Sequence, residues 1–95
     1  MDREEALSLL DAHLARYRKL SYAELAAKIG DEEFPEVVGP SGAAYQIDIQ
    51  VCWDHKPNGD IRVLGAIDDG GLRAFMPLSS YLFVTPYEHN SDVER

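Results

Sequence analysis

The stretch Tyr45-Gln46-Ile47-Asp48-Ile49-Gln50-Val51-Cys52-Trp53-Asp54 decides the fold, because apolar and polar residues alternate along it without a break. Successive side chains of a β-strand point to opposite faces of the sheet. A period of two therefore predicts a strand with one apolar and one polar face. We expect the apolar face, with Tyr45, Ile47, Ile49, Val51 and Trp53, to lie on the core.

The downstream sequence predicts a partner strand. The loop His55-Lys56-Pro57-Asn58-Gly59 leads into a second strand over Asp60–Asp68, so that Asp54 lies opposite Asp60. This turn sets the register of the whole pair, because cross-strand partners share one face. The expected partners are Trp53 with Ile61, Cys52 with Arg62, Val51 with Val63, Gln50 with Leu64, Asp48 with Ala66, and Ile47 with Ile67.

A third strand is predicted over Leu72–Met76, because Asp69-Gly70 is a favoured pair for a two-residue hairpin turn. Its expected cross-strand partners are Leu72 with Ile67, Ala74 with Gly65, and Met76 with Val63. Ile49, Gly65 and Ala74 would then form a low spot where a helix can approach closely. The apolar run Tyr81-Leu82-Phe83-Val84 predicts a further strand or turn within residues 77–86 that packs on the sheet.

Two helices are predicted before the sheet. Asp2 and Glu5 have the spacing of a capping box, and an apolar stripe follows at helical spacing, formed by Leu7, Leu10, Leu14 and Tyr17. The second helix begins with the capping box of Ser21 and Glu24 and ends at Gly30. An acidic turn over residues 31–33 and a short strand over Glu36–Val38 complete the connection to the sheet.

The order of these elements predicts an α+β fold. The two N-terminal helices are expected to pack on one face of a three- to five-stranded antiparallel meander sheet. The chain has 95 residues, enough for one domain. We expect this domain over residues 1–86 and a flexible charged C-terminal tail over residues 87–95.

The second face of the sheet is the candidate functional surface. The predicted register places Leu64 beside Phe75 and near Cys52, with charged residues around them. An apolar centre with a charged rim is typical of protein interfaces. The predicted interaction residues are Leu64, Phe75, Cys52, Arg62, Arg73 and Asp48. They are expected to bind a protein partner or a second copy of the chain as a homodimer, unless residues 77–86 fold over the patch.

The charge of the chain restricts its partners. Nine Lys and Arg stand against seventeen Asp and Glu, a net charge of −8. Such a chain repels phosphate backbones and anionic membrane surfaces, so neither nucleic acid nor a membrane is expected as a partner. A basic protein is a better match, by analogy with small acidic immunity-type proteins that bind toxins. The start Met1-Asp2-Arg3-Glu4-Glu5 lacks signal-peptide order, and the expected location is cytoplasmic.

Two segments resemble known binding motifs but lack essential residues. Tyr22–Gly30 is similar to the first helix of a helix-turn-helix unit, yet the acidic Asp31–Pro35 follows where a recognition helix needs Arg, Lys or Asn. Asp54–Asp60 is similar to a calcium loop. However, Lys56 stands at its third position and Gly65 at its twelfth, where acidic ligands are expected. We expect a core helix and a hairpin loop.

The histidines and the cysteine predict no catalytic or metal centre. His13, His55 and His89 lack the spacing of a ligand set, so no metal or cofactor is expected. Cys52 needs a neighbouring imidazole to act as a nucleophile, and its expected partner Arg62 is the one feature that favours a reactive thiolate. We expect Cys52 to be a small filler on a half-buried face.

The stretch Trp53–Leu78, with Gly39-Pro40-Ser41-Gly42 upstream, resembles small bacterial domain proteins of unknown function. The resemblance covers most of residues 20–86. It implies a compact bacterial, cytoplasmic domain, and it implies no activity and no site residue.

The function predicted from these features is that of a small non-enzymatic protein-interaction module. The alternative is a small ligand-binding domain or enzyme that uses Asp48, Arg62 and Arg73. Few convergent catalytic groups support the alternative.

Overall fold

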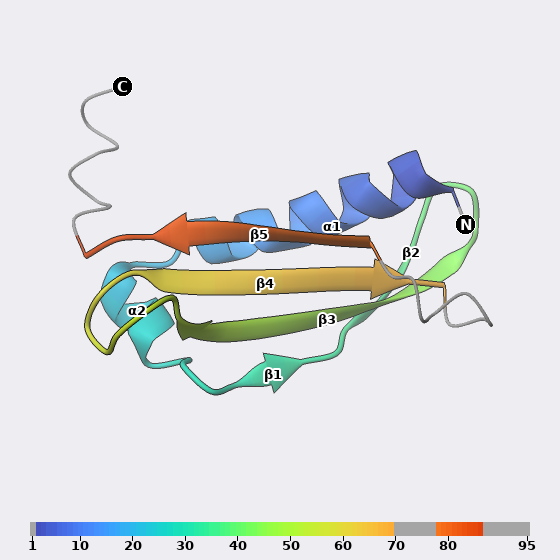
Figure 1. Cartoon of the computed structure of the whole chain (residues 1–95). Helices are drawn as coiled ribbons and strands as arrows, with labels where there is room; N and C mark the ends of the chain where they lie inside the picture. The colour runs from blue at the N-terminus through green and yellow to red at the C-terminus, as the bar shows by residue number, and fades with distance from the viewer. Residues whose placement is uncertain (1, 70–77, 87–95) are drawn as a thin grey trace, which may run out of the picture.

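The computed structural model describes residues 2–69 and 78–86, which form two helices and one five-stranded antiparallel sheet. The elements are α1 (Arg3–Arg18), α2 (Tyr22–Ala26), β1 (Glu32–Glu33), β2 (Glu36–Val38), β3 (Ala44–Trp53), β4 (Ile61–Asp68) and β5 (Leu78–Val84). The sheet order is β1-β3-β4-β5, and β2 also pairs with β3. Figure 1 shows α1 behind β4 and β5, which it contacts. The predicted α+β fold is confirmed; the tail over residues 87–95 lies outside the described residues.

The predicted hairpin of β3 and β4 is confirmed. All the expected partners are found, from Ile47 with Ile67 to Trp53 with Ile61. The Asp54 N–H donates to the Asp60 carbonyl at 2.8 Å, which closes the loop. The Tyr22 hydroxyl of α2 donates to the Gly59 carbonyl at 2.6 Å, so the loop is also fastened to the helical layer.

The third strand differs from the prediction. β4 pairs with β5, which places Leu78 opposite Ile67 and Val84 opposite Ile61. The expected pairing of β4 with Leu72–Met76 is therefore wrong, and Gly65 lies opposite Ser80 instead of Ala74. Pairing with β5 buries Leu82 and Val84 on the core side, to 4% exposure each. This burial favours β5 as the partner of β4 although it lies further along the chain. Residues 72–76 themselves, with Arg73 and Phe75, lie outside the described residues.

Helix α1 begins at the predicted cap, because the Asp2 side chain accepts from the Glu5 N–H at 3.0 Å. The carboxylate of Glu5 was expected to complete the capping box. It instead accepts from the Ser41 N–H, the Ser41 hydroxyl and the Tyr45 hydroxyl at 2.7–2.8 Å. These hydrogen bonds, that of the Ser41 N–H foremost, lower the pKa of Glu5. They also hold the β2–β3 turn against the start of α1.

The second helix keeps its predicted start but is short. Ser21 and Glu24 form the complete capping box, and Gly30 takes the left-handed φ of 91° that favours glycine. The Gly30 N–H then donates to the Val51 carbonyl at 2.9 Å, which brings the chain to the edge of β3. The segment expected to be an acidic turn therefore contains β1, with Glu33 opposite Ile49.

The core lies between α1 and one side of the sheet, which we call the inner face. The buried stripe of α1 is Ala6, Leu10, Leu14 and Tyr17, whereas Leu7 is only half-buried. Gly65 is what lets α1 approach β4. A Cβ atom there would lie 2.9 Å from the Leu10 Cδ1 atom and 3.2 Å from the Ile49 Cδ1 atom. Neither described helix is long and apolar enough to span a membrane.

We predict that Gly65→Ala lowers the free energy of unfolding by about 1–2 kcal/mol, because Leu10 is fully buried and cannot move away from the added methyl group. Denaturant unfolding followed by circular dichroism measures the change. Ala66→Val adds bulk at the next position of the same strand, on the opposite face, and is expected to change stability by less than about 0.5 kcal/mol. Equal stability of Gly65→Ala and wild type contradicts the close approach.

Candidate functional site

The side of the sheet turned away from α1, which we call the outer face, is not covered by any described helix. Figure 1 shows this face toward the viewer, with α1 behind the sheet. The outer side chains of the three long strands alternate with the core residues. They include Gln46, Asp48, Gln50 and Cys52 on β3, Arg62, Leu64 and Ala66 on β4, and Ser79, Tyr81 and Phe83 on β5.

An aromatic patch occupies the β4–β5 half of the outer face; we define it as Leu64, Tyr81 and Phe83. Tyr81 is 59% exposed and Phe83 44% exposed. Their ring centroids lie 5.1 Å apart with an angle of 65° between the planes, an edge-to-face arrangement. Tyr81 lies directly opposite Leu64 on β4. Residues 78–84 thus extend the outer face sideways instead of folding over Leu64.

The aromatic patch differs in part from the predicted interaction surface. Leu64 lies on the outer face as expected, but its aromatic neighbour on β5 is Tyr81. The predicted neighbours Phe75 and Arg73 lie outside the described residues. The alternation of Tyr81 and Phe83 with Leu82 and Val84 is the sequence signal for this placement.

An acidic edge flanks the patch on the β1–β3 side; we define it as Glu32, Glu36 and Asp48. Glu32 lies opposite Gln50, whose Nε2 donates to the Glu32 Oε2 at 2.8 Å. The Asp48 Oδ1 atom is buried and has no hydrogen-bond partner. Burial foremost, and then a side-chain hydrogen bond with Glu32 and its charge, raises the pKa of Asp48. The fold therefore disfavours the ionised form of Asp48 relative to the unfolded chain, and a nearby cation would oppose this effect.

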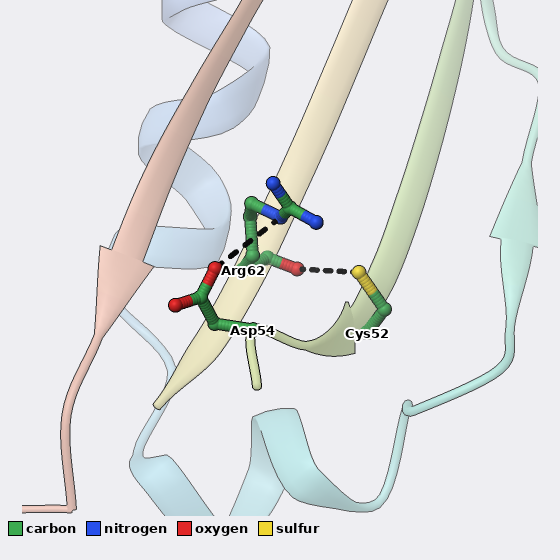
Figure 2. Close-up of polar contacts among 3 residues, drawn as sticks. All are labelled: Cys52, Asp54 and Arg62. Carbon is green, nitrogen blue, oxygen red and sulfur yellow. Dashed lines mark hydrogen bonds and ion pairs between the residues drawn. The ribbon is translucent and has the colours of Figure 1, made fainter. Parts of the chain in front are cut away.

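Arg62, Asp54 and Cys52 form a small polar cluster at one end of the outer face (Figure 2). The Arg62 Nε atom lies 3.7 Å from the Asp54 Oδ1 atom, and the Cys52 thiol donates to the Arg62 carbonyl oxygen at 3.8 Å. The guanidinium group is near the Asp54 carboxylate only through its Nε atom, beyond hydrogen-bond distance, while the thiol contacts the backbone. These contacts suit a packed structural cysteine, as the sequence predicts.

Of the residues of the alternative enzymatic function, Asp48 and Arg62 lie apart on the sheet, and Arg73 lies outside the described residues. Asp48 lies opposite Ala66 and Arg62 opposite Cys52, so four residues of strand separate them, about 13 Å. A depression of about 230 Å³ lies beside Asp48 and does not include Arg62; it is lined by Asp48, Gln50, Leu64, Gly65, Ala66 and Ser79. Within residues 2–69 and 78–86, no three His, Cys, Asp or Glu side chains are grouped as a metal site requires.

A larger cleft, of about 430 Å³, lies on the helix side of the molecule. His13, Arg16 and Tyr17 of α1 line it together with Leu20 after the helix, and Lys28, Glu33 and Pro35 line its other walls. The Tyr17 hydroxyl donates a hydrogen bond to Glu33 across it. In the sequence, His13 is only one of three histidines that lack the spacing of a ligand set. The available signal is the spacing of residues 13, 16 and 17, which places them on neighbouring positions of one helix.

Comparisons of the chain with protein-family models, with curated proteins and with solved structures find no match.

We predict that Asp48→Asn raises the thermal unfolding midpoint near neutral pH by about 2–4 °C, because it removes a charge that burial and Glu32 disfavour. A group with a raised pKa in the fold favours the folded state at low pH, and this advantage is lost as the pH rises through that pKa. The difference between variant and wild type should therefore shrink as the pH falls into the acid range. Glu36→Gln is the matched control for loss of an outer-face charge. A midpoint for Asp48→Asn at or below that of wild type contradicts the raised pKa of Asp48.

Proposed function

We propose that the protein is a non-enzymatic interaction module that binds a basic segment of another protein through the outer face of its sheet. The observation that carries the proposal is the exposed aromatic patch beside the acidic edge, on a face that no described helix covers. Apolar side chains of the partner would pack on the patch, and its Lys or Arg side chains would reach the acidic edge.

The aromatic patch indicates that the partner contributes apolar side chains. Single exposed apolar residues are common on protein surfaces, but Tyr81 and Phe83 contact each other and adjoin Leu64. Aromatic side chains with this exposure provide much of the energy of many interfaces, because each buries a large area with few rotatable bonds. The patch therefore favours a protein partner over a polar small molecule.

The acidic edge indicates that the partner carries positive charge. Asp48 has a buried oxygen atom without a hydrogen-bond partner, and the Glu32 carboxyl is next to it. A Lys or Arg side chain of a partner would approach these two carboxyls from the solvent side and would favour their ionised forms. The bound cation would thus offset the cost of ionising Asp48 in the fold.

A second copy of this chain fits the face less well than a basic partner. A homodimer through the outer face would place two acidic edges in one interface, where like charges oppose association. Arg62, which could compensate, already lies near Asp54. The net charge of −8 adds to the repulsion between copies and to the attraction of a basic chain.

The proposal includes a cytoplasmic location. Cys52 is a free thiol that contacts a backbone carbonyl, and such a cysteine suits a reducing compartment.

We predict that an amphipathic leucine–lysine peptide binds the protein, whereas a leucine–glutamate peptide of the same length and pattern does not. Two double variants, Tyr81→Ser with Phe83→Ser and Glu32→Gln with Asp48→Asn, should each weaken binding by about tenfold, or about 1.4 kcal/mol. Isothermal calorimetry measures the affinity, and NMR chemical shifts locate the peptide on the sheet.

A matched control separates this surface from general attraction between opposite charges. Glu4→Gln with Asp11→Asn removes the same charge from α1, on the other side of the sheet. This control should bind the peptide as wild type does. Equal weakening by the control overturns the proposal. So does a wild-type homodimer, measured by sedimentation, that the Tyr81 and Phe83 substitutions convert to a monomer.

A further inference from the structure

The open cleft on the helix side has the volume and lining of a small-molecule site and is separate from the outer face. Its volume of about 430 Å³ falls within the range of ligand pockets. Leu20, Pro35 and the Tyr17 ring give it apolar walls, and a few polar groups converge on it. Sites for organic ligands commonly combine an apolar lining with a small number of placed polar groups.

The cleft exists because of how the helices cover the sheet. α1 contacts β4 and β5, and α2 has only five residues. The Tyr17 side chain therefore fills only part of the space between the second half of α1 and β1. Its hydroxyl donates a hydrogen bond to Glu33 across that space. Tyr17 is 6% exposed, so its ring forms a fixed wall of the cleft.

The charges that line the cleft contrast with those of the whole chain. Arg16 and Lys28 line it, and in the described part of the chain neither is within ion-pairing distance of a carboxylate. Glu33 is the acidic residue of the lining, and its carboxylate accepts from the Tyr17 hydroxyl. With neutral His13, these groups give the cleft one positive charge in a chain whose net charge is −8.

His13 is placed to respond to a ligand charge. Its pKa is lowered by burial and by the Arg16 guanidinium, and the Glu33 carboxylate acts in the opposite direction. The groups around it are Arg16 and Tyr17 on α1, Lys28 after α2, and Glu33 on β1. An anion bound between Arg16 and Lys28 would stabilise the imidazolium form of His13.

From this geometry we infer that the cleft binds a small organic monoanion, a carboxylate with an apolar body, with the anionic group between Arg16 and Lys28 and the body against Tyr17, Leu20 and Pro35. One excess positive charge suits a monoanion better than a polyphosphate. The apolar walls select against inorganic anions, because these lose hydration there without a compensating contact.

The test uses 2-naphthoate as the probe and 2-naphthamide as its neutral counterpart of the same shape. NMR titration of the wild-type protein should give 2-naphthoate a dissociation constant of about 0.1–1 mM and 2-naphthamide one at least about tenfold weaker. Arg16→Gln with Lys28→Gln should weaken 2-naphthoate binding by about tenfold. Arg3→Gln with Lys56→Gln, which removes two cations elsewhere, should leave it unchanged.

The pH dependence of 2-naphthoate binding provides a second measurement. Binding of 2-naphthoate should raise the pKa of His13, followed by its imidazole signals, and the affinity should therefore increase between about pH 8 and about pH 5.5. His13→Gln should remove most of this increase. Equal binding of the two probes, or full affinity in the Arg16 and Lys28 variant, overturns the inference. So does loss of 2-naphthoate binding on Tyr81→Ser with Phe83→Ser, which would place the probe on the aromatic patch.

Discussion

The contact of α1 with the sheet at Gly65 is the constraint on which the rest of the structure depends. Because no side chain is present there, Leu10 and Leu14 lie directly against β4, and α1 covers the β4–β5 half of the inner face. Two consequences follow from this position. All the buried apolar residues lie on one side of the sheet, which leaves the outer face open among the described residues. On the inner face, the β1 side is left to the short α2 and to Tyr17, and the cleft forms there.

The outer face and the cleft carry charges of opposite sign. The acidic edge lies on the outer face, where the Asp48 and Glu32 carboxyls are neighbours, whereas Arg16 and Lys28 line the cleft beside α1. A cationic partner and an anionic ligand would therefore bind on opposite sides of the sheet. Binding at one surface does not require the other, and substitutions at the two surfaces should act independently, since no residue is shared between them.

The sequence predicts the local features well because each depends on nearby residues. The alternation along β3 and the turn after Asp54 are enough to define every β3–β4 partner, and Ser21 and Glu24 are enough to define the start of α2. The identity of the next strand could not be predicted in this way. Residues 72–76 and 78–84 have similar apolar alternation, and the choice depends on which segment buries more apolar surface beside β4. Leu64 was thus correctly placed on the outer face, but its aromatic neighbours were not. The cleft requires α1, α2 and β1 at once, so no local pattern predicts it.

The accessibility of the aromatic patch tests the central claim, that the outer face is an open surface, most directly. Paramagnetic relaxation by a soluble, uncharged gadolinium chelate reports the solvent exposure of each side chain in the NMR spectrum of the monomer. The account predicts strong relaxation of the Tyr81 and Phe83 ring protons and almost none for the methyl groups of Leu10 and Ile47, which are fully buried. Protection of Tyr81 and Phe83 to the level of Leu10 would mean that the chain covers its own outer face, and it would contradict the account.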